Sequence, residues 1–144
     1  MPMQNETIVS LLVGAPLVGS FFLPSLGRLC ERTRNGAAFL MVLVSLLATI
    51  VLIPVLMNGG TVTVWFGDVA LFQADRLAVF MAFVSSLVGA IIVLYSIGYI
   101  SHYEHRNEYY FMVVLFLGAM MGLVFSRNLI GLYLFWEITA IACW

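Results

Sequence analysis

The sequence predicts an all-α integral membrane protein with about five transmembrane helices and a small external hairpin between the second and third. Of its 144 residues, 63% are hydrophobic and 9% are charged, whereas a soluble domain carries about 25% charged residues. Apolar runs also recur at close to the roughly 20 residues that a helix needs to cross the hydrocarbon of a bilayer. We therefore expect residues 1–144 to form one membrane domain surrounded by lipid.

The apolar runs define the expected helices in order, at residues 8–26, 37–57, 77–100, 109–126 and 129–144. The N-terminus carries Glu6 and no Lys or Arg, unlike the positive start of a secretory signal, so we interpret the first run as a retained helix. The fifth run is the shortest, and at about 1.5 Å per residue it falls short of the far interface. This shortness predicts either a helix end inside the membrane, a partner chain that covers the end, or a fragment.

Prolines and glycines mark where the helices should bend or pack. Pro16 and Pro54 lie inside the first two runs, where each removes a backbone donor and is expected to bend the helix. Gly118 and Gly122 form a GxxxG on the fourth run, a spacing that permits close approach by another helix. Helix packing is the expected use of this pair.

The second connection, residues 58–74, contains a strand pattern. Thr61 to Trp65 alternates with a period of two, and Gly67-Asp68 follows as a turn signal before a second short apolar stretch. We therefore expect a hairpin outside the membrane. Asp75 precedes the third helix in the position of an N-cap.

The arginines predict the orientation, because cytoplasmic loops accumulate positive charge. Arg28, Arg32 and Arg34 cluster in the expected first loop, whereas the second connection holds acidic residues and only Arg76. The first loop should then be inside, the N-terminus outside, and the 102–108 loop inside. This arrangement fits a multi-pass protein of the cell inner membrane.

Several site types are not supported. The chain has no Lys and no basic run that could follow a phosphate backbone, which excludes nucleic acid as a partner. Cys30 and Cys143 lack a zinc or disulfide spacing, and a His102-x-x-His105 pair alone is a weak metal signal, so we expect a solvated loop there and no metal. No motif for a cofactor is present. Tyrosines on either side of that loop should mark the membrane boundary; they are Tyr95, Tyr99, Tyr103, Tyr109 and Tyr110.

Glu137 is the ionisable side chain placed deepest in an expected span. Nine residues from Asn128 at about 1.5 Å each put it about 13 Å deep, near the bilayer centre. A carboxylate there costs about 2.5 to 3.5 kcal/mol and indicates a functional site. The alternative is a protonated Glu that hydrogen-bonds a neighbouring helix and moves no ion. Tyr133, four residues earlier, is the polar neighbour on the same face, and Thr139 is not.

The second half of the chain resembles the N-terminal part of the antiporter-like subunits of respiratory complex I, membrane-bound hydrogenases and multisubunit cation/proton antiporters. The segments that carry the resemblance are Ala74-Asp75-Arg76-Leu77, Tyr95-Ser96-Ile97-Gly98-Tyr99-Ile100, Tyr110-Phe111, Arg127-Asn128-Leu129 and Tyr133-Leu134-Phe135-Trp136-Glu137. Two features depart from the family pattern. Arg76 replaces a small residue, and the sequence stops within the fifth helix.

The resemblance implies a role for Glu137 as a proton-pathway carboxylate, working with a Lys on a later helix that this sequence does not contain. It implies translocation of protons, or of sodium, by a split piece or fragment of a larger module whose redox chemistry belongs to other subunits. The expected partners are those membrane subunits, including a chain that supplies the remaining helices. Two alternatives are a structural subunit that only packs its neighbours and a self-contained small transporter.

Overall fold

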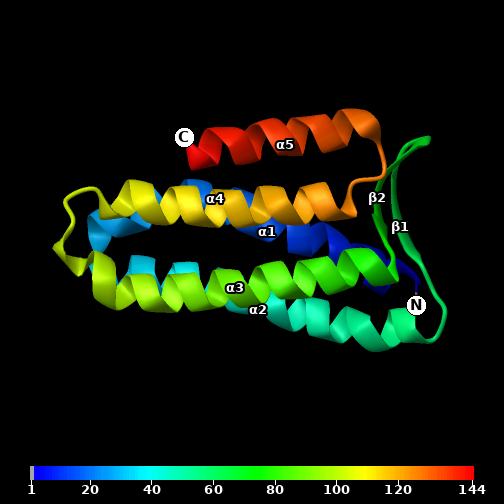
Figure 1. Cartoon of the computed structure of the whole chain (residues 1–144), viewed down its shortest axis with the longest axis horizontal. Helices are drawn as coiled ribbons and strands as arrows, with labels where there is room; N and C mark the ends of the chain where they lie inside the picture. Colours follow the sequence, from blue (N-terminus) through cyan, green and yellow to red (C-terminus); the bar gives the residue numbers. More distant parts are fainter. Residues whose placement is uncertain (1) are drawn as a thin grey trace.

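Five α-helices lie side by side in the computed structural model, which describes residues 2–144 (Figure 1). They are α1 (Pro2–Leu29), α2 (Glu31–Met57), α3 (Arg76–Tyr99), α4 (Arg106–Phe125) and α5 (Leu129–Cys143). The strands β1 (Val62–Phe66) and β2 (Val69–Ala74) join α2 to α3, and a short 3-10 turn, η1 (Ile100–His102), follows α3. The predicted fold class is confirmed. Met1, which we expected outside the membrane, lies outside the described residues.

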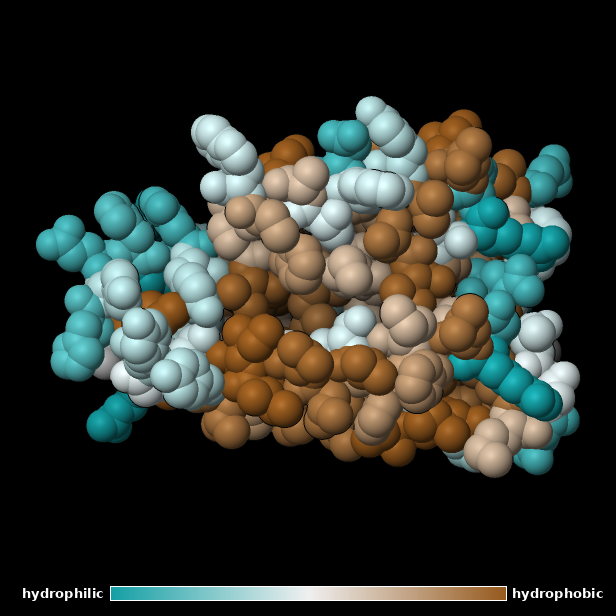
Figure 2. Space-filling view, in the orientation of Figure 1, coloured by the Kyte–Doolittle hydropathy of each residue, from teal (hydrophilic) through white to brown (hydrophobic). Residues whose placement is uncertain are grey.

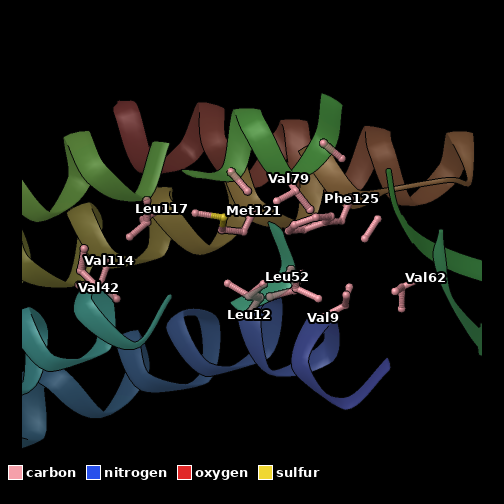
Figure 3. Packing of buried hydrophobic residues seen from close by; sticks show 14 of the residues in the cluster. Val9, Leu12, Val42, Leu52, Val62, Val79, Val114, Leu117, Met121 and Phe125 are labelled. Atoms are coloured by element: carbon pink, nitrogen blue, oxygen red, sulfur yellow. The ribbon is translucent and has the colours of Figure 1, made fainter. Parts of the chain in front are cut away.

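The first four helices form a bundle, and α5 packs on its outside against α4. Helix α1 contacts α2 and α4, while α3 contacts the same two neighbours. Buried side chains from all four meet along the bundle, among them Leu12, Leu52, Val79 and Met121 (Figure 3). This packing leaves the opposite face of each helix outward.

Those outward faces are apolar, as a lipid environment requires. Figure 2 shows hydrophilic residues gathered mainly at the two ends of the molecule, with a hydrophobic band between them. Phe21, Leu40, Phe80 and Ile91 are each about 60% exposed, a pattern that a protein in water would not tolerate. Helices α1 to α4 are long and apolar enough to cross a membrane, and α5 is an apolar helix of 15 residues.

The predicted hairpin is confirmed, and it also contacts a later part of the chain. Strands β1 and β2 pair antiparallel, with an irregularity between Val64 and Trp65. The turn uses Gly67 at φ 64°, a left-handed conformation that glycine adopts at low cost. The Arg127 backbone N–H donates to the Leu71 carbonyl at 3.0 Å. The hairpin is thereby tied to the connection between α4 and α5.

The start of α3 is capped as predicted. The Asp75 carboxylate accepts from the Ala78 backbone N–H at 2.8 Å, which satisfies one of the four free donors at the helix start. At the same end, the Arg76 guanidinium donates to the Leu56 carbonyl of α2 at 3.3 Å. The residue that departs from the family pattern therefore fastens α3 to α2.

The predicted first loop is wrong, because Cys30 alone separates α1 from α2. Arg28 lies in the last turn of α1, and Arg32 and Arg34 lie in the first turns of α2. Arg and Glu favour helices, so the polar residues around the turn extend both helices beyond their apolar runs. Helix α1 accordingly extends beyond its predicted limits at both ends, and α2 and α4 begin earlier than predicted. The limits of α3 and α5 agree with the prediction to within one residue.

The GxxxG pair packs helices together, as predicted. A Cβ added at Gly118 would lie 3.0 Å from the Leu17 backbone nitrogen of α1. One added at Gly122 would overlap the Phe135 ring of α5. The absence of side chains at these two positions allows α4 to contact α1 on one side and α5 on the other. Pro16 and Pro54 both lie inside their helices.

Candidate functional site

Three contacts fix the position of α5. Its first turn is capped by Asn128, whose side-chain oxygen accepts from the Ile130 backbone N–H at 3.1 Å. Phe135 lies against Gly122 of α4, and its ring also contacts Phe72 of the hairpin at a centroid distance of 6.0 Å. Helix α5 is therefore held by both the bundle and the hairpin, with Phe135 as the shared anchor.

Glu137 lies two residues beyond that anchor and on a different face of α5. Its side chain is exposed, and the hydroxyl of Tyr133 lies beside its carboxyl group. This contact confirms the predicted shared face of residues 133 and 137. Thr139 instead donates to the Trp136 carbonyl of its own helix at 2.5 Å. The carboxyl group thus has one polar neighbour within the helix and an open side beyond it.

The open side sets the chemistry that Glu137 can perform. Glu137 is the single charged residue of α5, and no residue of α5 is buried within the described part of the chain. The side chains next to it along α5 are mainly aromatic and aliphatic, and Tyr133 and Trp136 are each more than 60% exposed. Because a carboxylate surrounded by apolar groups is costly, this face requires a polar or cationic counterpart. With such a counterpart, the group can bind and release a proton.

Hydroxyl groups inside the bundle do not extend this site. Ser20, Ser45, Thr49 and Ser86 are buried, and each donates to a carbonyl of its own helix. Ser96 also reaches the Tyr109 hydroxyl of α4 at 2.9 Å. Within residues 2–144, that Ser–Tyr contact is the hydroxyl pair that joins two spans. The candidate site is therefore on the outer face of α5 and not in the bundle core.

The burial of Arg34 was not predicted from the sequence. Its side chain is 3% exposed, its Nη1 donates to the Asn107 side chain at 2.5 Å, and its guanidinium lies 5.0 Å from the Tyr110 ring centre. It continues the buried stripe of α2, which is Arg34, Ala38, Val42, Ser45, Thr49, Leu52 and Leu56. The helical spacing of these residues was the signal that could have indicated the burial of Arg34. We did not use it because we had assigned Arg34 to a loop.

The tyrosines at this end divide into two groups. Tyr95, Tyr99 and Tyr103 are exposed, as a membrane-boundary position predicts. Tyr110 is 1% exposed and packs against Arg34 inside the bundle, so it does not face lipid, and Tyr109 is half-buried. His102 and His105 are both exposed, as expected for a solvated loop, and His105 lies 3.9 Å from Glu108.

Comparison with known proteins confirms the resemblance found in the sequence. The family model for the N-terminus of chain 5 of NADH-ubiquinone oxidoreductase (complex I) matches residues 69–110. The Na(+)/H(+) antiporter subunit A1 of Staphylococcus aureus is 36% identical over 141 residues, which cover 93% of this chain and 18% of that protein. The same subunit of strain JH9 matches equally. The chain thus spans about a fifth of the length of these relatives.

A solved structure shows the same arrangement of helices. It is that of the membrane-bound sulfane sulfur reductase, an archaeal respiratory membrane complex, which matches with a TM-score of 0.80 at 20% identity. The match covers 94% of this chain and 29% of the other. At that identity the likeness establishes the fold. That fold is the fold of a multi-pass membrane protein.

Proposed function

We propose that this chain forms the first helices of an antiporter-like module that translocates protons. Na⁺ is either exchanged for the protons or carried in their place. The observation that carries the proposal is Glu137, an acidic side chain on the apolar helix α5 with the Tyr133 hydroxyl beside it. A carboxylate within the membrane is costly, so its presence indicates a functional role such as ion movement. The relatives named above support the ion class, because one is named as a Na(+)/H(+) antiporter subunit.

The proposal includes a partner that completes the site. The exposed face of α5 would pack against further helices of the same module, supplied by this protein beyond residue 144 or by another chain. A Lys on one of those helices would approach Glu137, as the family resemblance implies. Since a neighbouring cation favours the ionised carboxylate and burial disfavours it, their approach and separation would bind and release the proton. Other membrane subunits of the complex would surround this module.

The proposed setting is the cell inner membrane with the N-terminus outside. Four of the six arginines lie at the end of the bundle that carries the α1–α2 and α3–α4 turns: Arg28, Arg32, Arg34 and Arg106. The hairpin end carries Arg76 and Arg127 together with Asp68 and Asp75. By the positive-inside rule, the turn end would be cytoplasmic.

Transport by the complete complex tests the proposed function. Inside-out vesicles that contain the complex are first acidified, and a pH-sensitive dye then follows proton release after addition of NaCl, KCl or choline chloride. We expect NaCl to release protons and choline chloride to have no effect. Vesicles from cells that lack this protein provide the background. An assembled complex that moves no protons, either with these salts or during redox turnover, would favour the structural alternative.

Labelling of Cys30 tests the orientation. Cys30 is exposed in the α1–α2 turn, and hydrogen bonds from the backbone N–H groups of Thr33 and Arg32 lower the pKa of its thiol. A lower pKa gives more thiolate at neutral pH, so labelling should be fast and should persist to lower pH than that of an ordinary thiol. With Cys143→Ser as background, a membrane-impermeant maleimide should label inside-out vesicles and spare right-side-out ones. The reverse pattern would contradict the orientation.

A further inference from the structure

A large cavity opens between the end of α3 and the start of α4, away from Glu137. Its volume is about 970 Å³, at the upper end of the range of small-molecule sites. Ile91, Ile92 and Tyr95 form its apolar part, and His102, Glu104 and His105 lie at its polar mouth. Neither the proposed ion pathway nor the bundle core uses these residues.

The cavity lies across the membrane boundary. The apolar span of α3 ends at Tyr99, so Ile91 to Tyr95 lie at hydrocarbon depth and residues 102–105 lie beyond it. A water-soluble ion would not occupy the apolar half, and a hydrocarbon chain would leave the polar half unused. The two halves together fit an amphipathic molecule with its head at the level of the turn.

The wall of the cavity includes a row of aromatic rings. Tyr95 and Tyr99 stack with ring centres 5.5 Å apart, and Tyr99 and Tyr103 follow at 6.2 Å. A hydrogen bond between Tyr99 and Tyr103 raises the pKa of the Tyr103 hydroxyl, so the ring remains neutral at physiological pH. Tyrosine faces attract cations, and an ammonium group is best held where such a face lies near a carboxylate.

We infer that this cavity binds one zwitterionic membrane phospholipid with a primary-ammonium head group. Its acyl chain lies along Ile91 and Ile92. The phosphate accepts N–H hydrogen bonds from His102 and His105, while the ammonium lies between Glu104 and the Tyr103 ring. This charge complementarity selects against an anionic lipid, because a phosphate without an ammonium group leaves the charge of Glu104 uncompensated. It also selects against a quaternary ammonium, which cannot donate a hydrogen bond to the carboxylate.

Lipid retention by the complete complex tests the inference. The purified complex is equilibrated with mixed micelles holding equal parts of phosphatidylethanolamine, phosphatidylcholine and phosphatidylglycerol, and native mass spectrometry identifies the lipids that stay bound. We expect phosphatidylethanolamine to be retained. Ile92→Trp fills the apolar part and should reduce its retention at least about fivefold, the equivalent of ordinary overpacking. Leu94→Trp is the control, since Leu94 is 60% exposed on the same helix and does not line the cavity.

The head-group contacts have their own pair of variants. Glu104→Gln should reduce the preference for phosphatidylethanolamine over phosphatidylcholine by about three- to fivefold, the usual size of a partly exposed charge contact. Glu108→Gln, on the same loop and outside the cavity lining, should leave that preference unchanged. Retention of phosphatidylglycerol in preference, retention that Ile92→Trp does not alter, or a cryo-EM map with a neighbouring protein segment in the cavity would each overturn the inference.

Discussion

Replacing Glu137 with Gln in the intact complex should remove most proton translocation, by at least about tenfold, while the complex still assembles. Gln has the size and hydrogen-bonding reach of Glu, including its contact with Tyr133, but it cannot bind and release a proton. The neutral amide also costs less among apolar groups than a carboxylate does. Stability should therefore hold while transport falls. The measurement is proton uptake in vesicles, normalised to assembled complex.

Two further variants separate titration from packing. Glu137→Asp should give intermediate transport, because it keeps the proton but withdraws the carboxyl group by one methylene. Thr139→Val is the matched control on α5, since the Thr139 hydroxyl bonds its own helix and is not expected to take part. Transport at the wild-type rate with Gln at position 137 would leave this residue as a structural hydrogen-bonding group, and the proposed ion pathway would be withdrawn.

Gly118→Leu should destabilise the protein by about 1 to 3 kcal/mol or more, the range found for overpacked cores. The backbone of α1 lies against this position: an added Cβ would come within 3.0 Å of the Leu17 nitrogen and 3.1 Å of the Pro16 side chain. Backbone cannot yield as a flexible side chain does, so α1 and α4 would have to separate. Because α4 also carries α5, we expect transport to fall together with stability.

A second glycine in the bundle provides the control. A Cβ added at Gly14 of α1 meets no atom within 4 Å, and an Ala there should stabilise the helix by up to about 1 kcal/mol. Gly118→Ala should have the opposite sign. Thermal stability in detergent, followed by size-exclusion chromatography after heating, compares the two positions. Equal effects at Gly14 and Gly118 would contradict the close α1–α4 packing.

Local features of the fold were predictable because each depends on residues close in the sequence. The apolar runs, the alternating Thr61–Trp65 stretch, the Gly67-Asp68 turn and the Asp75 cap each specify a short piece of backbone. Each is found in the predicted part of the chain, although α1, α2 and α4 extend beyond their apolar runs. The contact between Tyr133 and Glu137 follows in the same way, because residues four apart share a helix face.

Contacts between distant segments were not predictable in this way. Arg34 was assigned to a loop because it lies between the apolar runs 8–26 and 37–57, yet Asn107 and Tyr110 of α4 make a buried site for it. The backbone hydrogen bond between Arg127 and Leu71 likewise depends on how the hairpin packs against the α4–α5 connection. The proposed partner of Glu137 is a further case, because no residue of α5 is buried in the described chain and the proposed contacts would come from other segments.

The polar contacts at the turn end also bear on the order in which the bundle forms during synthesis. Arg34 bonds Asn107, and Glu31 pairs with Arg106 at 2.8 Å, so residues 73 and 75 positions apart depend on each other. Because Cys30 is the single residue between them, α1 and α2 can enter the membrane as one helical hairpin before Asn107 is translated. During that interval the Arg34 guanidinium has to remain hydrated at the membrane surface. The arrival of α4 then draws it inward, which makes closure of the four-helix bundle a late step that waits for the second helical hairpin.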